Sequence, residues 1–242
     1  MNDSSAEKSA RPGTRGGPLL VLLAAACLLL LFGGLAIAVA LGGLMPLPYG
    51  PSGPVLDYVR AEPVAVEAGA VGAFASSVPL AVYAASASAR LRQLGAAQSA
   101  ATVTLTAGTL AAAALGLTGL LAWTLSRPDV SADPALVRAL YFLVFLVGGP
   151  GHIVALGLLV AGMAAPALVM GLLPKPLAWA GLAIAVLGEA ATLVLVWPGL
   201  GVILPVARVA ALLWLLLAGA MLPPHRAAVA VDHPANRVAG GG

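Results

Sequence analysis

Residues 19–32 read LLVLLAAACLLLLF, with no charge and no alternation of apolar and polar positions. A strand of a membrane barrel would alternate such positions. The apolar block around this stretch runs from Pro18 to Met45, which exceeds the 20 or so residues that a helix needs to cross the hydrocarbon of a bilayer. Because a helix satisfies its own backbone hydrogen bonds in lipid, the stretch predicts a membrane-spanning helix.

The whole chain shares this composition. Of its 242 residues, 61% are hydrophobic and 9% are charged, whereas soluble domains carry about 25% charged residues. The formal net charge is +3, but the basic residues stand singly at the ends of apolar blocks. This pattern predicts orientation in a lipid bilayer and no binding of nucleic acid. Cys27 is the only cysteine, which excludes an intramolecular disulfide and a cysteine-based metal site.

Six apolar blocks are separated by segments rich in proline, glycine and charge. The predicted spans are about Pro18–Met45, Val64–Ala87, Ala100–Leu125, Gly151–Leu173, Leu177–Val196 and Leu200–Met221. We therefore predict an all-α fold, a multi-pass transmembrane helical bundle over residues 18–222. Polar residues 1–17 and 223–242 are predicted to be a disordered tail and a flexible tail. Ala-Val-Ala at 38–40 resembles a signal-peptide cleavage site, but the length of the first block favours an uncleaved anchor.

One apolar stretch is too long for a single span. From Pro134 to Leu173 it has 40 residues, about 60 Å as one helix and twice the thickness of the hydrocarbon core. The motif GGPG at 148–151 is expected to break it, which predicts an interfacial or re-entrant helix before the fourth span. A seventh span at 134–147 is the alternative, although 14 residues are too few to cross unaided. Asp133 before Pro134 is typical of a helix start.

The charged residues predict the orientation. With six spans, the side of both tails holds Lys8, Arg11, Arg15, Arg90, Arg92, Lys175, Arg226 and Arg237, and the other side holds Arg60, Arg127 and Arg138. The positive-inside rule places the basic-rich side in the cytoplasm. We therefore expect a protein of the cell membrane with both termini cytoplasmic.

Several short motifs resemble one known family. They are LGLLVAG at 156–162, LLPK at 172–175, WAGL at 179–182, Gly188-Glu189, Arg208 followed by Leu213-Trp214, and the segment from Pro79-Leu80 to Arg90-Leu91-Arg92. Together they resemble an uncharacterised bacterial family of multi-pass membrane proteins, domain of unknown function four-three-eight-six, over roughly residues 19–223. The resemblance implies a fold and no chemistry, because that family has no assigned activity.

Four polar side chains fall in or beside the predicted spans: Glu67, His152, Glu189 and Arg208. Such groups are unfavourable in hydrocarbon and are functional candidates. Glu189 lies nine residues before Pro198 and Arg208 nine after Gly199. An antiparallel hairpin would put both at one depth, which predicts a buried ion pair. That pair is either a static clamp or a site that responds to a proton or ligand.

The other two candidates are weaker. His152 has no second histidine at ligand spacing, so a structural, hydrogen-bonded histidine competes with a proton relay or a metal ligand. Glu67 lies near the outer end of its span, where it can reach water. Small residues recur at Gly108, Ala112 and Gly116, and Glu189 is expected to share a face with Gly181, Ala185 and Thr192. Such stripes let membrane helices approach closely.

No sequence motif assigns an activity. Metalloprotease, serine-hydrolase and P-loop motifs are absent, so we predict neither catalysis nor a cofactor or metal. The chain has no internal repeat of the kind common in transporters. By elimination, the sequence favours a structural or accessory membrane subunit that packs on another membrane protein or on a second copy. A small-molecule or ion transporter using Glu189 and Arg208 is the alternative, and an intramembrane enzyme comes last.

Overall fold

The computed structural model describes residues 16–46, 49–50 and 52–223. Within these ranges the regular structure is helical, and six helices are long and apolar enough to cross a membrane. They cover Pro18–Gly42, Pro63–Gln93, Gln98–Leu125, Pro134–Met170, Lys175–Leu195 and Pro198–Met221. The predicted all-α, multi-pass bundle is confirmed. Nearly all of the two predicted tails lies outside the described residues.

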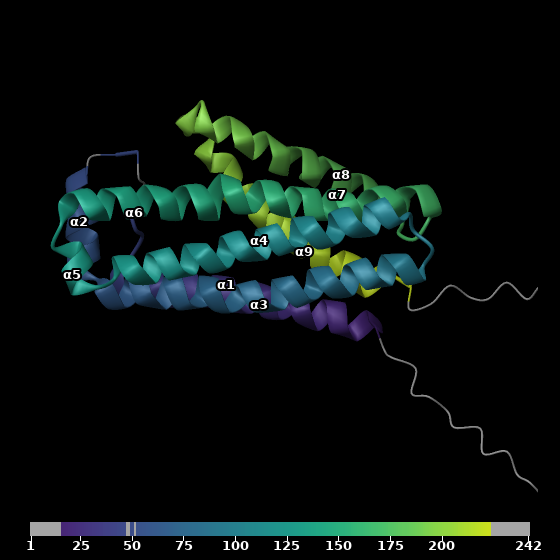
Figure 1. The fold of residues 1–242 in the computed structure, drawn as a ribbon, viewed down its shortest axis with the longest axis horizontal. Helices are drawn as coiled ribbons and strands as arrows, with labels where there is room; N and C mark the ends of the chain where they lie inside the picture. Colours follow the sequence, from purple (N-terminus) through teal and green to yellow (C-terminus); the bar gives the residue numbers. More distant parts are fainter. Residues whose placement is uncertain (1–15, 47–48, 51, 224–242) are drawn as a thin grey trace, which may run out of the picture.

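The six long helices form one elongated bundle (Figure 1). In chain order they are α1 (Gly16–Gly42), α3 (Pro63–Gln93), α4 (Gln98–Leu125), α6 with α7 (Pro134–Leu146 and His152–Met170), α8 (Lys175–Ala190) and α9 (Ile203–Met221). Two short helices, α2 (Ser52–Ala61) and α5 (Pro128–Ser131), lie together at one end, here called the α2–α5 end. The turns α3–α4 and α7–α8 lie at the opposite end, as do the described chain ends (Figure 1).

Glycines bring the central helices together. A Cβ atom at Gly119 of α4 would lie 2.6 Å from the backbone nitrogen of Phe74 in α3. The stripe of Gly108, Ala112 and Gly116 is buried in the same contact, so its predicted role in close packing is confirmed. The Tyr83 hydroxyl then ties α3 to α9, because it donates to the carbonyl of Leu215 at 2.7 Å.

The predicted break at 148–151 is wrong. Val147–Gly151 form a single π-helical turn, η1, that joins α6 to α7 (Figure 1). Pro150 has no N–H and its ring would clash with the carbonyl four residues back in an α-helix. A wider π turn accommodates such an insertion without ending the helix, and three adjacent glycines leave room for it. The joined helix has 37 residues, about 55 Å, so it extends well beyond the hydrocarbon core.

The segments at the α2–α5 end are more ordered than their composition predicts. Prolines and glycines in the stretch 46–63 favour an irregular loop, yet Ser52–Ala61 form α2. Val55 and Val59 of α2 are buried with Val137 and Tyr141 of α6, and this small core supplies the packing that overrides weak helix propensity. Asp133 caps α6 as predicted, accepting from the amides of Ala135 at 2.9 Å and Leu136 at 3.3 Å.

Candidate binding site at Arg208

Arg208 of α9 lies beside the π turn η1. Side chains on a helix tilt toward its N-terminus, so Arg208 extends toward η1, where one guanidinium nitrogen donates to the carbonyl oxygen of Gly148. The amide of His152 donates to Val147 and Gly149. Gly148 belongs to the same π turn, and its carbonyl oxygen accepts the hydrogen bond from Arg208. The Nε atom of Arg208 is buried and has no hydrogen-bond partner among the described residues.

Arg208 lines a cavity of about 800 Å³. Its walls come from α1, α3, α4, α6, η1, α9, the 3-10 turn η3 (Pro198–Val202) and Tyr49. The lining is mainly apolar, with Leu31, Leu115 and Phe145 among its residues, and Arg208 is the only charged side chain among the described residues that line it. The Thr118 hydroxyl in the same wall donates to the carbonyl of Ala114 in its own helix. A single guanidinium therefore dominates the polar chemistry of a large apolar cavity.

Glu189 does not pair with Arg208, so that prediction is wrong. The buried stripe of α8 continues from Gly181 and Ala185 through Gly188, and a Cβ atom at Gly188 would lie 2.9 Å from the Cα atom of Gly157 in α7. Glu189 is rotated one position away from that stripe and is exposed on the outside of the bundle. The equal spacing of the two residues from the turn did not determine the faces on which their side chains lie.

The surroundings of His152 are those of a structural, hydrogen-bonded histidine. It is fully buried, and its Nδ1 atom lies 2.9 Å from the carbonyl oxygen of Ala111 in α4. A carbonyl oxygen only accepts hydrogen bonds, so Nδ1 carries the proton and joins α7 to α4. The Nε2 atom is buried without a partner among the described residues. Among the described residues, no three His, Cys, Asp or Glu side chains lie close enough together to hold a metal ion.

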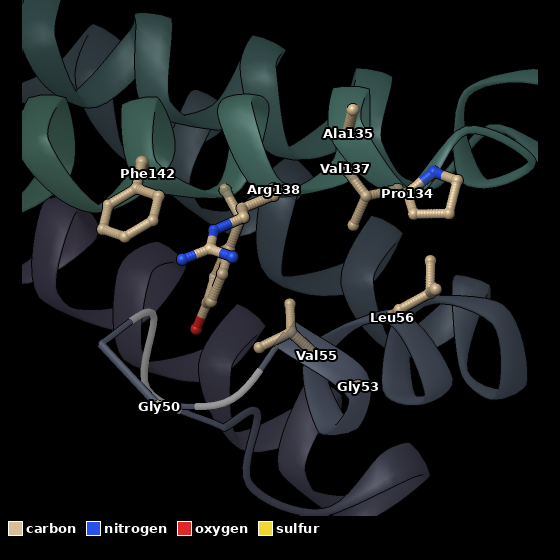
Figure 2. Close-up of a pocket in the computed structure, with 10 residues that line it drawn as sticks. Gly50, Gly53, Val55, Leu56, Pro134, Ala135, Val137, Arg138 and Phe142 are labelled. Carbon is tan, nitrogen blue, oxygen red and sulfur yellow. The ribbon is translucent and has the colours of Figure 1, made fainter.

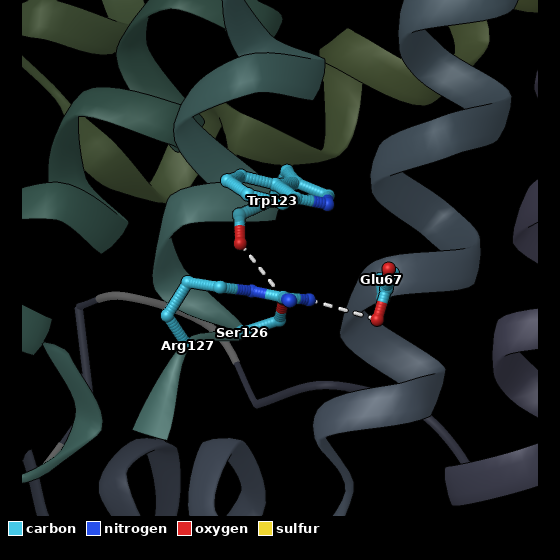
Figure 3. A network of polar contacts seen from close by, with 4 residues as sticks. All are labelled: Glu67, Trp123, Ser126 and Arg127. Atoms are coloured by element: carbon cyan, nitrogen blue, oxygen red, sulfur yellow. Dashed lines mark hydrogen bonds and ion pairs between the residues drawn. The ribbon is translucent and has the colours of Figure 1, made fainter. Parts of the chain in front are cut away.

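Glu67 forms an ion pair that was not predicted from the sequence. Arg127, which follows α4, donates to the Glu67 carboxylate at 2.8 Å and to the Ser126 hydroxyl at 2.8 Å. Its guanidinium carbon lies 4.3 Å from the centre of the Trp123 ring (Figure 3). The two charged side chains are 35% and 43% exposed. Trp123 and Arg127 stand four residues apart, a spacing that could have indicated their contact.

A second, smaller cavity of about 340 Å³ lies between α2 and α6 (Figure 2). Arg138 of α6 projects into the space between the two helices in the close-up. Nearby, Arg60 joins α2 to the end of α5, because it donates to the carbonyls of Ser131 at 2.8 Å and Ala132 at 3.1 Å. Burial, and to a lesser extent the Glu62 carboxylate, raises the pKa of Tyr58. These contacts order the α2–α5 end but gather no catalytic set of side chains.

Several lining residues of the Arg208 cavity had no sequence signal. Tyr49 and Phe145 of this lining pack edge-on with ring centres 5.2 Å apart, and Tyr49 also contacts Phe142 at 5.9 Å. Tyr49 is far from both phenylalanines in the sequence. Comparison of the chain with models of known families, with curated proteins and with solved structures gave no match. The family resemblance therefore stays a prediction, and the function has to be argued from the site itself.

Proposed function

We propose that this chain is a non-enzymatic membrane protein that binds an anionic amphiphile in the cavity at Arg208. The ligand class is a molecule with a carboxylate or phosphate head and an apolar body. The observation that carries the proposal is a guanidinium in the wall of a large apolar cavity, with no acidic side chain of the described residues paired to it.

The head group follows from the chemistry of Arg208. A guanidinium has five N–H donors, and the described residues supply one acceptor for those of Arg208, the oxygen of Gly148. A charge held in an apolar environment is unfavourable unless it is paired. An anionic oxygen group satisfies both needs, since it accepts paired hydrogen bonds from the guanidinium and neutralises its charge.

The apolar body follows from the size and lining of the cavity. A volume near 800 Å³ falls within the range of about 300–1,000 Å³ typical of small-molecule sites. Leu31, Leu35 and Val144 supply apolar surface along its walls. A small inorganic anion would leave most of this surface uncovered, so an amphiphile fits better than a simple ion.

The accessory-subunit prediction loses part of its support. It relied on small-residue stripes for docking a partner, and the structure uses both stripes inside the chain. Gly108 and Gly116 pack against α3, while Gly181 packs against Trp214 of α9. Binding through Arg208 is the function that the geometry favours. A carrier that moves the bound ligand across the bilayer would be an extension of that function. It would use Arg208 but not Glu189, which lies on another face.

We also propose that the protein resides in the cell membrane with the α2–α5 end outside and both termini in the cytoplasm. Arg90, Arg92 and Lys175 belong to the opposite end, which agrees with the positive-inside rule. Reporter fusions after Asp129 should be active outside, and fusions after Gln93 should be active inside. A reversed pair of signals would overturn this orientation.

Binding of radiolabelled oleate to detergent-purified protein tests the function. We expect Arg208→Gln to weaken oleate binding about tenfold or more, equivalent to at least 1.4 kcal/mol, and Arg208→Lys to weaken it less. The matched control is Arg138→Gln, which removes an exposed cation beside the smaller cavity. Methyl oleate lacks the charge and should bind the wild type and Arg208→Gln alike. Equal oleate affinity in the wild type and Arg208→Gln would refute the proposal.

A further inference from the structure

Two exposed tryptophans mark the boundaries of the hydrocarbon along α8. Trp179 lies near the start of α8, and Trp197 follows the short 3-10 helix η2 (Ala191–Leu195) at the other end. Tryptophan gathers at both interfaces between a membrane and water. Trp197 follows Trp179 by 18 residues, about 27 Å along a helix and close to the thickness of the hydrocarbon core. The hydrocarbon layer therefore lies between the depths of these two side chains.

The π turn that binds Arg208 lies near one of these boundaries. Antiparallel helices α7 and α8 meet at two glycines, where a Cβ atom at Gly188 would lie 2.9 Å from the Cα atom of Gly157. Gly148 lies nine residues before Gly157, and Trp197 lies nine after Gly188. Gly148 and Trp197 therefore lie at similar depths, to within about one helical turn. In agreement, the α8–α9 hairpin ends well short of the α2–α5 end (Figure 1).

The cavity at Arg208 is open on one side, between α1 and η3. Leu31 and Leu35 of α1 both line it, but Leu31 is 8% exposed and Leu35 is 52% exposed. Val202 of η3 also lines it and is 73% exposed. The end of α9 packs closely on α1, since a Cβ atom at Gly219 would lie 3.0 Å from the Cβ atom of Leu20. The start of α9 and η3 lie away from α1 (Figure 1), and we call the side between them the α1–η3 opening.

We infer that the ligand of this cavity is an anionic phospholipid, which enters through the α1–η3 opening from the leaflet on the side of the α2–α5 end. The inference rests on the function proposed above and names the source of its ligand. Phosphate oxygens of the lipid accept paired hydrogen bonds from the Arg208 guanidinium. An acyl chain covers the apolar wall. The head group stays near its usual depth in the leaflet, because Gly148, the partner of Arg208, is nearly level with Trp197.

A lipid fits this geometry better than an amphiphile taken from water. Anions in water are steered by exposed cations, but the border of the α1–η3 opening is formed by apolar side chains, with Leu35 and Val202 among them. A lipid keeps its chains in the bilayer while its head group reaches Arg208, so an apolar border does not hinder it. The cavity of about 800 Å³ then has to enclose only part of the molecule. Basic pockets between membrane helices bind lipid head groups in this way.

Photolabelling in proteoliposomes tests the inference. The bilayer is phosphatidylcholine with a trace of phosphatidylglycerol that carries a diazirine on one acyl chain. Mass spectrometry measures crosslinks to the cavity wall, at Leu115 and Phe145. We expect Arg208→Gln to lower these crosslinks about fivefold or more, because the phosphate loses its charged donor. Val202→Trp should lower them about as much by narrowing the opening.

The matched control is Val206→Trp. Val206 is exposed on α9 one turn beyond Val202 and does not line the cavity, so this variant should label as the wild type does. The unfolding temperature in detergent checks that both tryptophan variants fold. Equal crosslinking of the cavity wall in the two variants would overturn entry through the α1–η3 opening.

Oleate binding in detergent separates this inference from the proposed function. Oleate binding that depends on Arg208, together with phosphatidylglycerol crosslinks that are unchanged by Arg208→Gln, would overturn the phospholipid ligand and leave the proposed function standing. Oleate binding that is unchanged by Arg208→Gln would remove the function and the inference with it.

Quenching by spin-labelled phospholipids tests the depth of the opening. Cys27 is buried and is replaced by Cys27→Ser, so that Val202→Cys carries the only bimane label. We expect a nitroxide near the lipid head group to quench this label more than a nitroxide near the end of the acyl chain. Leu213→Cys is the control, because Leu213 is exposed 11 residues further along α9, about 16 Å deeper, and should show the reverse order. Stronger quenching at position 202 by the deep nitroxide would overturn the inference.

Discussion

Arg127 and Arg208 each carry a guanidinium charge that has to be stabilised, but their surroundings differ. Arg127 lies at the α2–α5 end, where Glu67 and the Trp123 ring surround a guanidinium that still reaches solvent. Arg208 lies within a span, where a backbone oxygen from a π turn is its partner and an apolar cavity adjoins it. Arg127 has a carboxylate, a hydroxyl and a ring as partners, whereas Arg208 has one backbone oxygen as its hydrogen-bond partner among the described residues.

This difference separates a stabilising contact from a candidate binding site. An exposed ion pair contributes little because water replaces either partner. A guanidinium in an apolar wall has no such replacement, so the groups that face it decide whether the charge is tolerated. The contrast between Arg127 and Arg208 therefore predicts unequal responses to the same substitution.

Reversal of charge gives the largest expected effect. Arg208→Glu removes the donor to Gly148 and sets a carboxylate against that oxygen, and we expect a loss of about 3 kcal/mol in the free energy of unfolding. Arg127→Glu sets a carboxylate near Glu67 at a wet site and should cost about 1 kcal/mol or less. Unfolding by increasing SDS in mixed micelles measures both. Equal losses would remove the distinction between the two sites.

Filling the π turn should give the next largest effect. A Cβ atom at Gly148 would lie 2.7 Å from the methyl carbon of Thr118, so Gly148→Leu should destabilise by about 1–3 kcal/mol through overpacking. Thr118→Ala in the same chain should restore part of that loss. Gly33→Leu is the control, since a Cβ atom there has no neighbour within 4 Å. Stability of Gly148→Leu equal to that of the control would show that the turn is not tightly packed.

The elements were predictable from sequence, but the facing of single side chains was not. Apolar blocks and charged ends predicted six spans because lipid imposes length and composition on every crossing. The π turn was missed because GGPG is compatible with either a break or a widened turn. Glu189 was misplaced because a one-position rotation of α8, set by Gly188 against Gly157, changes the face without changing the depth. The predicted pair rested on the equal spacing of the two residues from the turn, and the face that Glu189 was expected to share with Gly181 and Ala185 is wrong.

The ion pair at the α2–α5 end should give a small coupling. A double-mutant cycle with Glu67→Gln and Arg127→Gln isolates the pair from the ring contact with Trp123. We expect a coupling of about 0.5–1 kcal/mol, because both side chains are partly exposed. Raising the salt concentration should reduce it, since exposed charges are screened. A coupling above that range, unchanged by salt, would mean that the pair is more buried than its exposure indicates.

The smallest effect is expected between Glu189 and Arg208. Glu189 is exposed on the outer face of α8, and Arg208 donates to Gly148 inside the bundle. The two side chains therefore do not interact directly. Losses from Glu189→Leu and Arg208→Leu in monomeric protein in detergent should therefore add within about 0.5 kcal/mol, the range for independent sites. The Glu67–Arg127 cycle under the same conditions is the positive control. A coupling between Glu189 and Arg208 larger than that control would restore the ion pair across the hairpin, because only a direct contact or a shared partner makes the second loss depend on the first.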